Sequence, residues 1–149
     1  MNIEFFIFDR IPDAAITDGM LKLYSTVFES SAEEMMGKMK TKPNLVLNIA
    51  MDGNKVVGFK MGHELDKNKF YSWLGAVEPA YRKHRIASRL MEEQHHHLLA
   101  KGYEIVQTKT MNKWRSMLIL NIKNGFDVID TYKDENGLHK IILEKRLKA

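Results

Sequence analysis

The feature that most constrains the fold of this chain is a strand-like segment that runs through a basic turn directly into a helix-like segment. Residues 70–77 are rich in aromatic and β-favouring side chains, and Pro79, which cannot donate a ladder hydrogen bond, stops them. From Ile86 to about Lys101 the apolar residues recur at intervals of three and four, the spacing of one helical face. The chain must therefore turn after Pro79 and begin a helix near Ile86.

The first turn of that helix is predicted to bind an anion. A helix N-terminus leaves backbone N–H groups without partners and carries roughly half a positive charge, so a phosphate placed there is both hydrogen-bonded and electrostatically favoured. Cations normally destabilise such a terminus, yet four of them gather here: Arg82, Lys83, Arg85 and Arg89. A solvated basic surface is the plainer interpretation, but the strand, turn and helix around the charges favour an anion site.

This turn resembles the coenzyme A-binding turn of the GCN5-related N-acetyltransferase (GNAT) family, whose pattern is (Gln or Arg)-x-x-Gly-x-(Gly or Ala). Here the pattern reads Arg-Lys-His-Arg-Ile-Ala over residues 82–87. Arg82 and Ala87 match the pattern, whereas Arg85 stands where the family usually has Gly. If the loop requires a positive φ at this position, Arg costs free energy that Gly would not.

A second block, residues 112–126, is similar to a downstream GNAT block that begins with Asn and ends in Gly-Phe. We expect a helix from about Lys113 to Lys123, with Asn112 as its N-cap and Gly125 just past its end. The apolar side chains that we expect it to bury are Met117, Leu118, Leu120 and Ile122. Asn112 fits a plain helix cap and a cofactor contact equally well.

The resemblance implies an α/β (α+β) fold: one GNAT-like domain over residues 1–149, with a mixed, mostly antiparallel sheet of about six or seven strands and about four helices. We expect strands over residues 3–8, 45–51, 56–65, 70–77, 103–108, 126–132 and 138–147, and helices over residues 16–28, 32–39, 86–101 and 113–123. The strands 70–77 and 103–108 are predicted to be parallel neighbours joined through a helix. In the family these two strands splay apart to form the cofactor cleft, and Gly75 is predicted to mark a bulge that starts the splay.

The resemblance further implies acetyl-coenzyme A as cosubstrate, with its pantetheine arm on the strand edge before the turn and its pyrophosphate on the amides of the turn and helix. The predicted cofactor-binding residues are Ala76, Val77, Arg82, Lys83, His84, Arg85, Ile86, Ala87, Ser88, Asn112 and Asn121. In the family a Tyr often protonates the leaving thiolate at the position of Asn121. An amide cannot be that acid.

The predicted chemistry is direct attack of a primary amine on the thioester, without an acyl-enzyme, because the chain has no Cys and no recognisable Ser-His-Asp order. His63 and Glu64 are adjacent on a strand, so only one of them can face the cleft. Glu64 is predicted to do so as a catalytic residue, together with Tyr71. Trp73 and Phe28 are predicted to contact the acceptor substrate. From the sequence alone, ordinary packing explains the four strand side chains at positions 63, 64, 71 and 73 at least as well.

The composition is compatible with this interpretation. The absence of Cys excludes disulfide scaffolds and thiolate zinc sites, and His95, His96 and His97 diverge by about 100° per residue on a helix, which favours solvated surface over a metal site. No apolar run approaches the roughly eighteen residues of a membrane span, and the N-terminus lacks the layout of a signal peptide, so a soluble cytoplasmic protein without a membrane partner is expected. The 23 basic residues are interleaved with 19 acidic ones, which argues against a nucleic-acid partner.

Two other functions stay open at this point. A coenzyme A-binding or regulatory module would keep the fold without the transfer chemistry, and a nucleic-acid binder would use residues 82–89 and show steep salt dependence. The acceptor, a small-molecule or peptide amine, is not identified by the sequence, and a homodimer is compatible with it.

Overall fold

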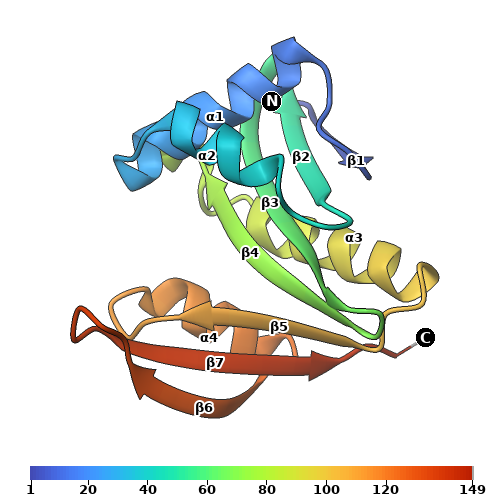
Figure 1. The fold of residues 1–149 in the computed structure, drawn as a ribbon. Coiled ribbons are helices and arrows are strands. Elements are labelled where there is room, and N and C mark those ends of the chain that lie inside the picture. The colour runs from blue at the N-terminus through green and yellow to red at the C-terminus, as the bar shows by residue number, and fades with distance from the viewer. Residues whose placement is uncertain (149) are drawn as a thin grey trace.

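A single mixed sheet of seven strands organises the chain, and the divergence of its fourth and fifth strands decides where a ligand can lie (Figure 1). The structure is a computed structural model that describes residues 1–148. Its strands are β1 (Ile3–Phe8), β2 (Val46–Asp52), β3 (Lys55–Asp66), β4 (Lys69–Val77), β5 (Ile105–Thr110), β6 (Asp127–Lys133) and β7 (His139–Arg146). Its helices are α1 (Ala14–Phe28), α2 (Ala32–Met39), α3 (Ile86–Ala100) and α4 (Arg115–Lys123), with a short 3₁₀ turn at Pro79–Tyr81.

The strands follow the order β1-β2-β3-β4-β5-β7-β6, and all neighbours are antiparallel except β4 and β5, which are parallel. The predicted strands and helices, and the parallel pair joined through a helix, are thus confirmed. Within residues 1–148, no helix is both long enough and apolar enough to cross a membrane.

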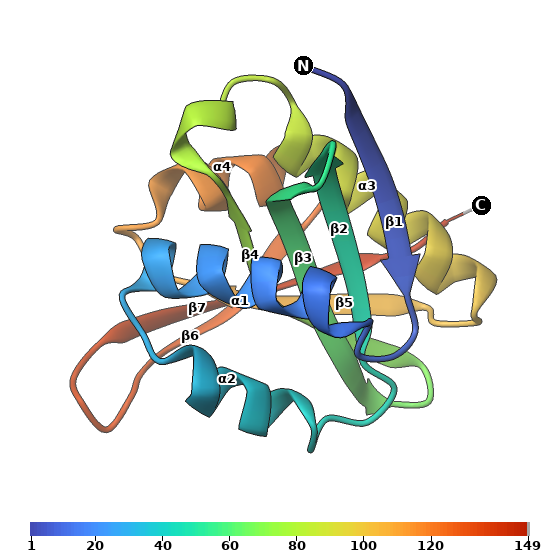
Figure 2. The same ribbon diagram turned by 90° about the horizontal axis from the view of Figure 1, so that it is seen from above.

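Helices cover both faces of the sheet. Figure 2 shows α1 and α2 on one face and α3 and α4 on the other. Alternation along β2 sends Leu47 and Ile49 into the core beneath α1 and α2, and Val46 and Ala50 into the two clusters on the α3 side. Because both faces are covered, β2 and β3 consist largely of apolar residues instead of alternating with polar ones.

The ladder between β4 and β5 is short. It extends over four residue pairs, from Lys69 with Ile105 to Ser72 with Thr108, where the Thr108 hydroxyl donates a 2.9 Å hydrogen bond to the Ser72 carbonyl. From Leu74 to Val77, β4 pairs with β3 alone, and in Figure 1 the ends of β4 and β5 diverge. The predicted splay is therefore present, and it exposes the β5-side edge of β4.

The bulge that accompanies the splay lies at Trp73, so the prediction of a bulge at Gly75 was wrong. Met61 pairs with Leu74 and Gly62 pairs with Ser72, which leaves Trp73 as the extra residue. The close approach occurs at Gly62, where a Cβ would lie 2.3 Å from the Tyr71 carbonyl oxygen. Gly75 instead pairs regularly with Lys60 of β3.

The start of α4 also differs from the prediction. The helix begins at Arg115 with Trp114 as its N-cap, which makes no side-chain capping hydrogen bond, so the predicted cap at Asn112 was wrong. Asn112 lies in a turn closed by a 3.0 Å hydrogen bond from the Trp114 amide to the Met111 carbonyl. Ile122 was predicted to be buried but is 53% exposed, because α4 turns Asn121 inward instead, which is 2% exposed. Gly125 follows the helix with a φ of 94°, as predicted.

The histidine run on α3 is not uniformly solvated, contrary to the prediction. His95 is 7% exposed and packs against the Phe126 ring, with 5.6 Å between centroids. His96 is exposed, and His97 binds Asp9 at 2.7 Å. One helical face carries both His95 and the apolar residues Met91 and Leu98, which the apolar spacing alone did not reveal.

Candidate functional site

The basic turn after β4 is pinned to the β2–β3 hairpin. The Glu78 amide donates a 2.8 Å hydrogen bond to the Val57 carbonyl, and the Tyr81 hydroxyl donates a 2.6 Å hydrogen bond to the Asp52 carboxylate. Lys55 adds an ion pair of 2.9 Å to Glu78. These contacts fix the direction in which the chain leaves β4, and so they position the N-terminus of α3.

The N-terminus of α3 is open to a ligand. Its N-cap, Arg85, has a φ of 61° and a ψ of 21°, in the left-handed region, and makes no side-chain capping hydrogen bond. Lys83 also has a positive φ of 70°. Left-handed residues within a turn can direct successive backbone N–H groups toward a common point, which makes an anion-binding concavity. The positive φ that Gly would adopt freely is thus present at Arg85.

The predicted cofactor residues differ in the groups that they can offer to a ligand. The four side chains of residues 82–85 are exposed, whereas Ile86 is 3% exposed and packs under Gly58, so only its backbone can face a ligand. Ala87 and Ser88 are half-buried, as are Ala76 and Val77 at the end of β4. A hollow of about 320 Å³ brings His84, Arg85, Ile86 and Ser88 together with β1. Asn112 is exposed and Asn121 is buried on α4.

On the opposite face, His63 lies between two aromatic rings of β4. Its ring centroid is 5.5 Å from that of Tyr71, its cross-strand partner, and 5.7 Å from that of Trp73. Its Nδ1 is 3.1 Å from the Glu64 carbonyl oxygen, and since a carbonyl only accepts, Nδ1 is the donor and Nε2 carries the free lone pair. Burial, together with the charge of Lys42, lowers the pKa of His63, so the imidazole is neutral at neutral pH.

Glu64 points the other way. Its carboxylate accepts a 2.8 Å hydrogen bond from the hydroxyl of Tyr103, a residue of the core cluster beneath α3. The prediction that Glu64 shares a cleft with Tyr71 and Trp73 was therefore wrong. The choice between residues 63 and 64 depends on the register of β3 against β4, which a single sequence does not reveal.

Comparison with known proteins identifies the family. Residues 15–115, well over half of the chain, match the model of the Acetyltransferase (GNAT) family. The chain belongs to the GNAT family. As a GNAT acetyltransferase it takes its acyl group from acetyl-coenzyme A, which confirms the resemblance seen in residues 82–87. The block 112–126 extends beyond the matched residues.

Solved structures share the fold of this GNAT protein over its whole length. The NatC complex bound to Gag peptide and CoA is 21% identical, with 99% of this chain and 100% of that chain covered and a TM-score of 0.83. An aminoglycoside 6'-N-acetyltransferase complexed with coenzyme A is 16% identical over 98% of both chains, with a TM-score of 0.81. A GNAT family acetyltransferase from Elizabethkingia anophelis with acetyl-CoA bound is 20% identical over 98% and 99% of the two chains, with a TM-score of 0.77. No curated protein matches the sequence.

Aromatic and basic side chains lie close together on the His63 side of this GNAT protein, and we call this group the rim. Three ammonium groups lie over rings: Lys42 over Trp73 at 4.9 Å, Lys109 over Tyr71 at 5.9 Å and Lys113 over Trp114 at 5.1 Å. Phe28, at the end of α1, meets the Trp114 ring before α4 at 6.5 Å. Lys42, Lys109 and Trp114 were not among the predicted site residues. The two lysines belong to no recognisable motif, and Trp114 stands at an unspecified position of the block 112–126.

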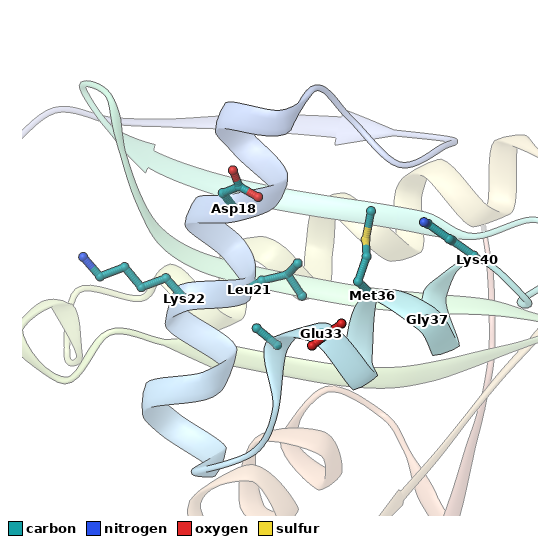
Figure 3. A pocket seen from close by; sticks show the side chains of 8 residues that line it. Asp18, Leu21, Lys22, Glu33, Met36, Gly37 and Lys40 are labelled. Atoms are coloured by element: carbon teal, nitrogen blue, oxygen red, sulfur yellow. The ribbon is translucent and has the colours of Figure 1, made fainter.

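A larger hollow elsewhere in this GNAT protein is not part of the site. It measures about 460 Å³ and lies between α1 and α2 (Figure 3). Its charged lining residues, Asp18, Glu33, Lys22 and Lys40, carry both signs, and none of the predicted site residues lines it. Residues 1–148 also contain no group of three or more His, Asp and Glu side chains placed to hold a metal ion.

Proposed function

We propose that this GNAT protein transfers the acetyl group of acetyl-coenzyme A directly to a primary amine of a small molecule or peptide, with His63 as the base. The observation that carries the proposal is the fixed tautomer of His63, whose free Nε2 lies on a neutral imidazole beside Tyr71 and Trp73. The chain has no Cys to form an acyl-enzyme, which supports direct transfer.

The residues present fit coenzyme A. The β5-side edge of β4 beyond Ser72 has no strand partner, so its backbone can pair with the amides of the pantetheine arm. The uncapped start of α3 and the positive-φ residues Lys83 and Arg85 supply N–H groups for the pyrophosphate. When bound, acetyl-coenzyme A supplies an activated acetyl thioester. The chain itself orients that thioester and moves protons.

A base is needed because the acceptor is protonated in water. An amine of the lysine type has a pKa of about 10.4, so its neutral form costs roughly 4 to 5 kcal/mol at pH 7. His63 can accept the proton at Nε2. Tyr71 cannot, because burial, with a smaller effect of Tyr132, raises its pKa to about 12, so it remains a hydrogen-bond donor. Trp73 and Phe28 then form apolar walls for the acceptor.

The charge of the rim restricts the acceptor. Within residues 1–148, none of the three rim lysines, Lys42, Lys109 and Lys113, takes part in an ion pair. Such a rim repels polycations and attracts an amine that carries a carboxylate or another anionic group nearby. The acceptor that fits best is therefore an amino acid or the N-terminus of an acidic peptide, in preference to a polyamine.

The experiment is to measure free thiol release from acetyl-coenzyme A with a panel of amines of graded charge. We expect acidic peptides to react faster than neutral ones, and polyamines to react slowest. In His63→Gln, kcat/KM at pH 7 should fall by about 10²- to 10⁴-fold, while the affinity for coenzyme A is unchanged. His96→Gln, the same change at an exposed histidine of α3, should behave as the unmodified protein.

Two results would contradict the proposal. Full activity of His63→Gln would remove His63 from the mechanism. Coenzyme A binding without thiol release for any amine would instead favour a binding or regulatory module, the alternative that the missing Tyr at position 121 keeps open.

A further inference from the structure

A polar layer is enclosed between α3 and the sheet. Leu90 and Leu98 of α3 lie one turn to either side of Gln94, and Leu90 packs in the cluster of Ala50 while Leu98 packs in the cluster of Val46. Asn48 lies midway between Val46 and Ala50 on the same face of β2, and its cross-strand partner on β3 is Lys60. This spacing places Gln94 over Asn48 and Lys60.

The amides of this layer are buried without protein partners. Gln94 is 0% exposed and Asn48 is 1% exposed, and none of their four side-chain nitrogen and oxygen atoms has a hydrogen bond within the described residues. Nε2 of the neighbouring His95 is unpartnered as well. Buried polar groups of this kind are normally satisfied, and enclosed water molecules are the ligand that fits several of them at once.

Lys60 connects this layer to the segment of β4 that has no partner on β5. Its partner on β4 is Gly75, and the Lys60 Cγ lies 3.7 Å from the position that a Cβ on Gly75 would occupy, so the lysine stem runs across the glycine. Gly75 is three residues beyond Ser72, the last residue of β4 that pairs with β5. The Lys60 side chain therefore extends from β3 over Gly75, a residue of the β4 segment along whose β5-side edge the pantetheine arm is proposed to run.

We propose that Lys60 is the general acid that protonates the leaving sulfur of coenzyme A, and that Asn48, Gln94 and His95 hold the water that returns the proton to it. This inference rests on the proposed function. It assigns the role that a Tyr often fills in the family, at the position where this chain has Asn121, which has no acidic proton to give.

The proposed step is balanced. The acceptor nitrogen forms a bond to the acetyl carbon as the carbon–sulfur bond breaks, and the sulfur takes the electron pair of that bond and a proton from the Lys60 ammonium. The acceptor ammonium loses one proton to His63 before the attack and a second as the amide forms, and His63 passes each of them to solvent. Lys60 regains a proton from solvent through the water of the layer. The products are an N-acetyl amine and a free thiol.

The surroundings of Lys60 support an acid that works near neutral pH. Burial alone lowers the pKa of Lys60 to about 8, close to the value of about 8.5 for an ordinary thiol. The other titratable groups facing the layer are His95 on α3 and Lys145 on β7, whose Nζ lies 3.2 Å from the His95 Nδ1. Burial, and then the charges of Lys145 and Lys60, lower the pKa of His95 to about 3, so it stays neutral. Asn48 on β2 and Gly75 on β4 do not titrate.

The test replaces the lysine and varies the leaving group. In Lys60→Met, kcat with acetyl-coenzyme A should fall by about 10²-fold while KM for acetyl-coenzyme A changes little. With S-acetylthiophenol, whose thiolate leaves without needing a proton, the same variant should lose little activity. Lys67→Met, at an exposed lysine in the β3–β4 turn, is the control.

A second readout does not depend on turnover. The thiol pKa of bound coenzyme A, followed by thiolate absorbance, should be lower in the unmodified protein than in Lys60→Met, because the ammonium favours the thiolate. Undiminished kcat in Lys60→Met, equal losses with both thioesters, or an unchanged thiol pKa would each overturn the proposal. If the unmodified protein released no thiol with any amine, the proposed function would fail instead, while the thiol pKa would still report on Lys60.

Discussion

Replacing Lys60 by Met should make the protein more stable at neutral pH. Burial moves the pKa of the lysine from 10.5 to about 8, and each unit is worth 1.36 kcal/mol, so the folded state holds the ammonium at a cost of about 3 kcal/mol. Met is unbranched and close to Lys in size, so it can fill the same space beside Gly75 without a charge. Below pH 8, Lys60→Met is therefore expected to be more stable by about 3 kcal/mol.

The stability difference between Lys60→Met and the unmodified protein should depend on pH. Between about pH 8 and 10.5 the unfolded chain keeps the lysine proton that the folded chain has lost, so the stability of the unmodified protein rises with pH across this window. Above pH 10.5 both states are neutral and the advantage of Lys60→Met disappears. Urea unfolding at pH 7, 9 and 11, with Lys67→Met as control, measures both effects. A variant less stable than the unmodified protein at pH 7, or a difference that does not change with pH, would refute the reasoning.

Three further variants test the turn and the bulge. Arg85→Gly should raise the free energy of unfolding by about 1 kcal/mol, measured in urea, because Gly adopts the φ of 61° without strain; a loss of stability would show that the Arg side chain supports the fold. Arg82→Ala combined with Arg85→Ala should raise the dissociation constant of coenzyme A at least about tenfold in calorimetry, or about 1.4 kcal/mol, and unchanged affinity would remove the basic turn from the site. Gly62→Ala should destabilise the protein by about 1–3 kcal/mol in thermal unfolding, because the new Cβ would lie 2.3 Å from the Tyr71 carbonyl oxygen. The control is Gly37→Ala, in open space on α2, which should be neutral or stabilising.

Local sequence patterns were sufficient to predict most of the helices and strands. The hairpin turn at residues 52–54, the stop at Pro79 and the helical spacing after Ile86 each act over a few residues, and the elements that they predict are present. The parallel pairing of β4 with β5 followed from the helix between them. The start of α3 at Ile86 also agrees with the local sequence pattern.

Features that depend on the register between strands could not be predicted from the sequence. The bulge at Trp73 and the choice of His63 over Glu64 are both set by how β3 aligns with β4. The cap at Trp114 in place of Asn112 accompanies packing of the Trp114 ring against Phe28, a contact between residues far apart in the sequence.

One signal in the sequence marks Lys60 as unusual. Lys60 interrupts an otherwise apolar run from Val56 to Met61, and a strand buried on both faces gives such a residue no route to solvent. A charge in this setting indicates either a partner or a function. The unpartnered amides of Asn48 and Gln94 became evident only when α3 was placed over the sheet.

The short ladder between β4 and β5 also affects how the protein unfolds locally. Four residue pairs join these strands, whereas eight join β3 to β4 and six join β5 to β7. Breaking those four pairs would divide the sheet into an N-terminal half and a C-terminal half without disturbing any other ladder. Amide hydrogen exchange should accordingly resolve two cooperative units. The hydrogen bonds of the β4–β5 ladder, beside which the ligands are proposed to bind, should open first.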